Sequence, residues 1–144
     1  ARGPLAAIFA GCLDDPRVSI READVASLIR AGKAGYDAIL LDVDNGPDGL
    51  MVEANDRLYD FAGLAAAKSA LRKGGVLAIW SAGPDRAFTE RLRMSGFAVG
   101  EKKVRANASG GGARHVIWLA TAAAADRDRS PPESTASRRG PHRR

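Results

Sequence analysis

The sequence predicts an α/β fold, in which helices alternate with the strands of a mostly parallel sheet and the chain closes on an antiparallel hairpin. The runs "AILL" at 38–41 and "VLAIW" at 76–80 are continuously apolar, as in strands covered on both faces. Segments with helical spacing of apolar residues separate the strands. Two strand-like segments then flank the turn "NASGGG", a pattern typical of a hairpin. This alternation predicts helices on both faces of the sheet.

Five strands are expected. The first, at 17–23, alternates apolar and polar residues, and the next two, at 37–43 and 76–82, are apolar and run parallel to it. The last two, at 97–106 and 113–122, form the hairpin.

Three helices are expected, at 25–32, 55–75 and 84–96. Gly32 and the pair Gly74-Gly75 are the predicted stops of the first two. The first helix is expected to bury Val25, Leu28 and Ile29. The second is expected to be one continuous helix with an apolar stripe formed by Leu58, Phe61, Ala62, Ala65 and Leu71.

Length and charge define one folded unit at 1–121 and a tail at 122–144. The tail holds six arginines against three acids, which is +3 of the net charge of +5. It is rich in Ser, Pro, Arg and Ala and cannot bury enough apolar surface to fold, so we expect it to be disordered. The folded unit has no basic stripe with interleaved aromatic residues, so no nucleic-acid partner is expected.

The sequence indicates a soluble, cytoplasmic protein. No run approaches the ~20 apolar residues needed to span a bilayer, no signal-peptide pattern is present, and no membrane partner is expected. The single cysteine, Cys12, excludes an internal disulfide and fits a reducing compartment.

Two acids follow predicted strands. Asp42 ends the strand in "YDAILLDVDNGP", and either it opens a polar turn or it lies at the mouth of a ligand cleft, since parallel strands bind ligands at their carboxyl ends. Asp24 follows the first strand and precedes a helix, where it can cap the helix or accept a hydrogen bond from a ligand.

The order of elements is that of the C-terminal part of a Rossmann-like nucleotide-binding domain. Such domains have seven strands in the order 3-2-1-4-5-7-6, and the closing hairpin supplies strands 6 and 7. The first two strands and their glycine-rich loop are missing from the 144 residues. We therefore expect the strand at 17–23 to be detached or to pair non-natively, and these residues alone to bind nucleotides weakly or not at all.

Five segments together resemble the spermidine synthase-like (polyamine aminopropyltransferase) family over about 3–120: "DDPRVSIREADV", "YDAILLDVDNGPDGL", "LRKGGVLAIWSAGPD", "SGF" and "ARHVIWLA". The resemblance implies transfer of an aminopropyl group from decarboxylated S-adenosylmethionine to an amine, with no permanently bound cofactor and no metal. It implies that Asp24, with the Val25 backbone beside it, binds the adenine, and that Asp42 is the catalytic carboxylate. Asp44 stands in for the second acid of the family loop, which here is two residues shorter, and Trp80-Ser81 replaces the family glutamine.

Two other interpretations stay open. The first is an S-adenosylmethionine-dependent methyltransferase, which has the same fold. The second is not an enzyme but a non-catalytic Rossmann-like binding module. His115 is expected to be structural or exposed at the rim of the sheet. The acceptor is expected to be a small-molecule amine or another small molecule, and a homodimer stays open.

Overall fold

The computed structural model describes residues 11–42, 55–106 and 112–122. Its elements, in chain order, are η1 (Cys12–Asp14), α2 (Val25–Ala31), β1 (Tyr36–Leu41), α3 (Asp56–Tyr59), α4 (Phe61–Ala70), β2 (Leu71–Ser81), α5 (Arg86–Met94), β3 (Phe97–Arg105) and β4 (Arg114–Ala122). Ala122 therefore ends a strand, and the remainder of the predicted tail and most of the hairpin turn lie outside the described residues.

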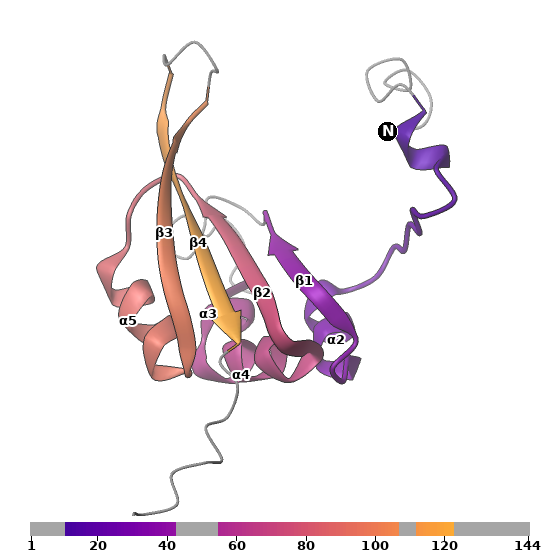
Figure 1. Ribbon diagram of the computed structural model, residues 1–144, viewed down its shortest axis with the longest axis horizontal. Helices are drawn as coiled ribbons and strands as arrows, with labels where there is room; N and C mark the ends of the chain where they lie inside the picture. Colours follow the sequence, from indigo (N-terminus) through magenta and orange to yellow (C-terminus); the bar gives the residue numbers. More distant parts are fainter. Residues whose placement is uncertain (1–10, 43–54, 107–111, 123–144) are drawn as a thin grey trace, which may run out of the picture.

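The four strands form one mixed sheet in the order β1-β2-β4-β3 (Figure 1). β1 pairs with β2 in parallel, and β4 pairs antiparallel with both β2 and β3. If β1 and β2 are strands 4 and 5 of the expected domain, this order is the predicted 4-5-7-6. The α/β fold class and the closing hairpin are thus confirmed.

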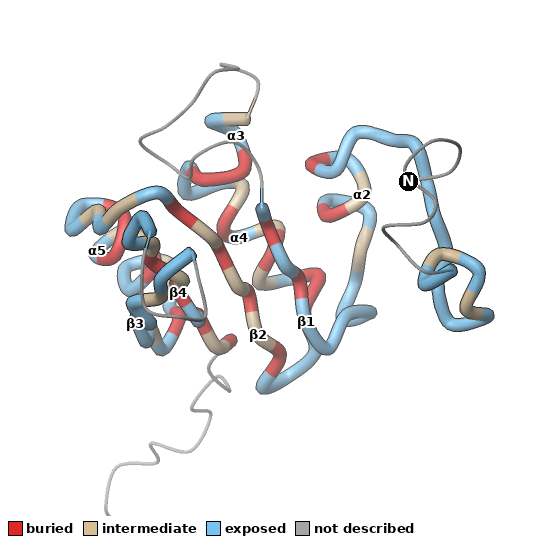
Figure 2. The backbone as a smooth tube through the Cα atoms, turned by 90° about the horizontal axis from the view of Figure 1, so that it is seen from above, coloured by how far each residue is buried: buried red, intermediate tan, exposed pale blue. Residues whose placement is uncertain are grey.

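The sheet has one covered and one open face. Residues such as Leu77, Ile79 and Trp118 are buried on the covered face, and α2 to α5 all lie on that side in the two views (Figures 1 and 2). On the other face Leu40 is 76% exposed and Leu119 is 42% exposed. Helices were predicted on both faces, but the described part of the chain supplies them on one face only.

An aromatic cluster packs α5 and α3 against the sheet. Phe88 of α5 and Trp118 of β4 are fully buried, with ring centroids 5.0 Å apart in an edge-to-face arrangement. Tyr59 of α3 contacts the other side of Phe88 at 5.8 Å. The Trp118 indole N–H donates to Thr89 Oγ1 at 2.9 Å, so its polar group is satisfied inside the core.

The predicted strand at 17–23 is wrong. These residues are exposed, belong to no strand, and run apart from the sheet between η1 and α2 (Figure 1). An alternating strand is stable only when one face is covered and a neighbour completes its hydrogen bonds, and in the described residues β1 pairs only with β2. Two outcomes were expected for these residues without a neighbouring strand, detachment or non-native pairing, and the structure has the detachment.

The predicted helix at 55–75 is interrupted by Asp60. The Asp60 backbone is extended, and its side chain accepts a hydrogen bond from the Gly63 N–H at 2.7 Å, so it ends α3 and caps a second helix, α4. The break shifts the buried face. Leu58, Leu64, Ala67 and Ala70 are buried, whereas Phe61, Ala62 and Ala65 of the predicted stripe are exposed.

The predicted helix stop at Gly74-Gly75 is also wrong, because α4 ends at Ala70 and both glycines belong to β2. The register between β1 and β2 shifts between Tyr36 and Ala38, which pair with Leu71 and Val76, so β2 carries extra residues there. Gly74 has a φ of 77°, in the left-handed region of backbone conformations. A residue with a side chain would be strained at this position.

The other helices are close to those predicted. Gly32 caps α2 as expected, but α2 buries Ala26 and Ile29 and leaves Val25 exposed. In α5, which lies within the predicted range 84–96, Phe88, Thr89 and Leu92 are buried. Among the described residues, no helix has the length and apolar character that crossing a membrane requires.

Replacing Thr89 by Val should destabilise the fold by about 1–3 kcal/mol, because the fully buried Trp118 N–H would lose its acceptor. Urea denaturation measures the change. Thr121→Val, on the same strand as Trp118 but half-buried, is the matched control and should change stability by less than about 0.5 kcal/mol. Equal effects of the two variants would show that the Trp118 hydrogen bond contributes nothing.

Candidate active site

The parallel strands β1 and β2 end side by side. Leu41 pairs with Ile79 in the last part of the register, and Asp42 directly follows β1 in an exposed position. Extending the register by one residue sets Asp42 beside Trp80. The position expected for Asp42, at the carboxyl end of a parallel strand, is therefore observed, and such edges are where α/β sheets bind ligands. Its catalytic role stays a prediction.

The alternation of side chains assigns Asp42 to the open face. Leu41 is buried on the covered face and Leu40 is exposed on the other, so the residue after Leu41 continues on the side of Leu40. Trp80, the residue beside it in the register, lies on the same side. A register continued by one residue past Leu41 would set the carboxylate of Asp42 on the same side as the indole of Trp80.

His115 adds an imidazole to this edge. It precedes Val116, which pairs with Ser81 at the end of β2, and its ring lies 4.7 Å from the ring of Trp80 with a tilt of 34°. Its Nδ1 atom is buried and has no hydrogen-bond partner among the residues that the structure describes. The sequence analysis expected His115 to be structural or exposed and missed this pair, since only the register between β2 and β4 brings the two rings together.

Asp24 is the N-cap of α2. Its Oδ2 accepts hydrogen bonds from the Ser27 N–H at 2.9 Å and the Ser27 hydroxyl at 2.6 Å, and the guanidinium of Arg30 is 3.6 Å away. The Ser27 hydroxyl lowers the pKa of Asp24 most, followed by the backbone N–H of Ser27, with a smaller effect from Arg30. Because carboxylate oxygens have several lone pairs, Asp24 can cap the helix and still accept a hydrogen bond from a ligand.

Asp24 lies toward the same end of the sheet as Asp42. A side chain at Gly32, where α2 ends, would contact Tyr36 at the start of β1 and Ala70 at the end of α4. The start of α2 lies instead near the start of α4, since Ala26 and Gly63 line one pocket. α2 therefore runs alongside α4 and opposite to β1, which directs Asp24 toward the carboxyl-end edge, as the sequence predicted.

The predicted site residues Asp24 and Asp42 do not contact one another through hydrogen bonds or ion pairs in the described segments. Val25 lies beside Asp24 with its side chain exposed. Asp44 lies outside the described residues, so its substrate-binding role stays a prediction. No cluster of three or more His, Cys, Asp or Glu residues suited to a metal ion occurs in the residues that the structure describes.

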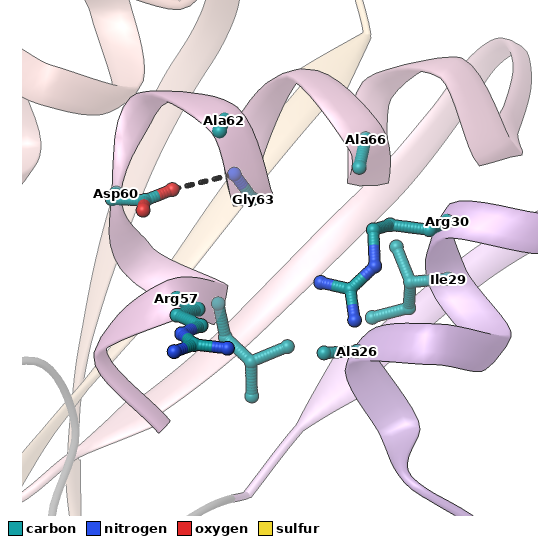
Figure 3. Close-up of a pocket in the computed structure, with 9 residues that line it drawn as sticks. Ala26, Ile29, Arg30, Arg57, Asp60, Ala62, Gly63 and Ala66 are labelled. Atoms are coloured by element: carbon teal, nitrogen blue, oxygen red, sulfur yellow. Dashed lines mark hydrogen bonds between the residues drawn. The ribbon is translucent and has the colours of Figure 1, made fainter. Parts of the chain in front are cut away.

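A pocket on the helical side of the molecule contains neither Asp24 nor Asp42. It opens between α2 on one side and α3 and α4 on the other (Figure 3). The sequence analysis did not predict it, because it is made by contacts between helices that are distant in the sequence.

Comparisons with known proteins establish the fold. No family model matches the sequence, and no curated protein matches it. Among solved structures, the chain is similar to a spermidine synthase in complex with the transition-state analogue AdoDATO, with a TM-score of 0.62, 20% identity, and coverage of 84% of this chain and 39% of that one. It is similar to spermidine synthase from Thermotoga maritima, with a TM-score of 0.63, 20% identity, and coverage of 84% and 40%.

A third structure is a methyltransferase. The 1,6-didemethyltoxoflavin-N1-methyltransferase of Burkholderia thailandensis, with bound 1,6-didemethyltoxoflavin and S-adenosylhomocysteine, has a TM-score of 0.55, 20% identity, and coverage of 86% of this chain and 59% of that one. The chain spans about two fifths of the length of the two spermidine synthases. At this identity the similarity shows that the chain has a Rossmann-like, methyltransferase-type fold, and it leaves the reaction to be argued from the site.

Replacing Ser27 by Ala should raise the pKa of Asp24 toward its ordinary value, because the largest cause of its lowering is lost. Carboxyl-carbon NMR titration measures this pKa. A lowered pKa in the folded state stabilises the protein above the ordinary pKa of 3.8, and this contribution disappears as the pH falls through the folded-state value. In the control Ser69→Ala the titration of Asp24 should be unchanged. An unchanged midpoint in Ser27→Ala would contradict the assignment.

Proposed function

We propose that the protein is a spermidine synthase-like transferase, which moves an aminopropyl group from decarboxylated S-adenosylmethionine to an amine. The observation that carries the proposal is Asp42, an exposed carboxylate directly after a parallel strand, in a fold similar to that of two spermidine synthases. One of those enzymes is described in complex with AdoDATO. The order β1-β2-β4-β3 supports the same frame.

In this reaction the amine nitrogen attacks the propyl carbon next to the sulfonium. The carbon–sulfur bond breaks, and its electrons leave with sulfur as a neutral thioether, so the leaving group needs no acid. The amine, however, must be neutral when it attacks and loses a proton when the bond forms. Asp42 accepts that proton or selects and orients the neutral amine.

Asp24 binds the other end of the nucleotide in this proposal. Its carboxylate accepts a hydrogen bond from the adenine amino group, while the Ser27 contacts hold the carboxylate in position and lower its pKa. An ionised carboxylate at pH 7 accepts such a hydrogen bond strongly. Binding needs no resident cofactor, since the nucleotide is the co-substrate.

A specific observation favours a second candidate, methyl transfer from S-adenosylmethionine to a flat acceptor. Trp80 stands where the aminopropyltransferase family has a glutamine, and its ring lies against that of His115. Stacked rings suit a planar acceptor better than a flexible polyamine. The methyltransferase among the similar structures is described with the acceptor 1,6-didemethyltoxoflavin.

Replacing Asp42 by Asn in the complete gene product should lower turnover by ~10²–10⁴-fold and leave nucleotide affinity nearly unchanged, because the amide has the size of the carboxylate but cannot accept the proton. Steady-state kinetics and calorimetry measure the two quantities. Asp37→Asn is the matched control, since Asp37 lies at the opposite end of β1 and forms an ion pair with exposed Arg72. Unchanged turnover in Asp42→Asn would remove this residue from the mechanism.

The choice of nucleotide separates the two transfers. The complete gene product should use decarboxylated S-adenosylmethionine at least tenfold better than S-adenosylmethionine, as kcat/KM with amine acceptors. The reverse preference would favour methyl transfer. Failure to bind either nucleotide would support the non-catalytic binding module.

A further inference from the structure

The pocket between α2, α3 and α4 has the features of a binding site. It encloses about 240 Å³ on the covered side of the sheet, between the starts of α2 and α4, and neither Asp24 nor Asp42 lines it. Its apolar floor is formed by Ala26, Ile29, Leu58, Ala62 and Ala66. Figure 3 shows the guanidinium groups of Arg30, from α2, and Arg57, from α3, on opposite sides of the pocket.

The charges around the pocket favour an anion. Arg30 and Arg57 carry two positive charges against the single negative charge of Asp60. The Asp60 carboxylate caps α4 by accepting a hydrogen bond from the Gly63 N–H, and it keeps its negative charge. Arg57 makes no hydrogen bond or ion pair through its side chain in the described part of the chain, and the contacts of Arg30 are a 3.3 Å hydrogen bond to Ser27 and a 3.6 Å ion pair with Asp24.

The close packing of α4 on α3 fixes this geometry. A β-carbon at Gly63 would clash with the carbonyl oxygens of Arg57 and Leu58. Glycine at this position thus allows the first turn of α4 to rest on α3, and Arg57 and Leu58 are held beside the pocket. The site is built by backbone contacts as well as by exposed side chains.

The lining also distinguishes between anions. A free phosphate is commonly bound by backbone N–H groups at a helix N-terminus, but here the Gly63 N–H is already taken by Asp60, whose negative charge repels a dianion. A carboxylate carries one charge and matches the planar fork of a guanidinium. The apolar floor suits a compact hydrocarbon or aromatic body attached to it.

We propose that this pocket binds a small amphipathic carboxylate, with the apolar body on the floor between α2 and α4 and the carboxylate between Arg30 and Arg57. The proposal does not rest on the transferase function, because neither Asp24 nor Asp42 lines the pocket. It assigns the chain a second ligand site, between α2 and α4 on the covered side of the sheet.

Benzoate is the probe, and benzamide and inorganic phosphate are the comparison ligands. Amide NMR titration of the 144-residue chain with benzoate should shift the signals of Ile29, Leu58 and Ala66, and benzamide and phosphate should bind at least about tenfold more weakly. Arg57→Gln should weaken benzoate binding about tenfold, and Arg30→Gln should weaken it in the same direction. Arg86→Gln, an exposed arginine on α5, is the matched control and should have no effect.

A second variant tests the floor without changing charge. Ala66→Leu should fill the pocket and abolish benzoate binding while circular dichroism shows an intact fold. Equal binding of benzamide, equal binding of phosphate, or equal affinities of the Arg57→Gln and Arg86→Gln variants would each overturn the proposal. Benzoate binding that survives Ala66→Leu would overturn it as well.

Discussion

The pairing of β4 with β2 is the interaction on which the rest of this fold depends. It inserts the last strand between β2 and β3 and so joins the hairpin to the parallel pair β1-β2. It also carries Trp118 into the core, where the ring contacts Phe88 and the N–H reaches Thr89. The same register brings His115 against Trp80 at the end of β2. One strand pairing thus organises both the core on the covered face and the ring pair on the open face.

The two candidate binding regions lie on different sides of the sheet. On the covered side, α2 and α4 run alongside one another and enclose a pocket with two arginines. Asp42, Trp80 and His115 lie on the open side, at its carboxyl-end edge. The Asp42 carboxylate can accept a proton, the Trp80 ring can stack on a ring of the acceptor, and His115 offers an imidazole nitrogen. Asp24 connects the two regions, because it caps α2 toward the edge while Arg30, which lines the pocket, lies 3.6 Å from its carboxylate. A ligand that draws Arg30 away from Asp24 would therefore alter the charge next to the proposed adenine site.

The sequence predicted the elements that a local pattern of consecutive residues determines. It missed the features that depend on contacts between residues distant in the sequence. The continuous apolar runs identified β1 and β2, and the glycine turn identified the hairpin, because apolar runs and turn residues are properties of consecutive positions, although the described residues cover only one face of the sheet. The alternation at 17–23 satisfied the pattern of a strand, but no strand of the described sheet pairs with it. The break at Asp60 was missed because a capping side chain competes with helix continuation, and a stripe drawn across the break assigned Phe61 to the wrong face. The position of Asp42 followed from the end of β1 and that of Asp24 from its place before α2, whereas the pocket and the Trp80–His115 pair exist only through tertiary contacts.

The central claim is that the carboxyl-end edge binds an S-adenosyl nucleotide between Asp24 and Asp42. A crystal structure of the complete gene product grown with S-adenosylhomocysteine tests it most directly. The account predicts the adenine amino group within hydrogen-bond distance of the Asp24 carboxylate and the thioether sulfur on the side of Asp42. A nucleotide bound at the amino-end edge near Asp37 and Arg72, or with its adenine away from Asp24, would contradict it.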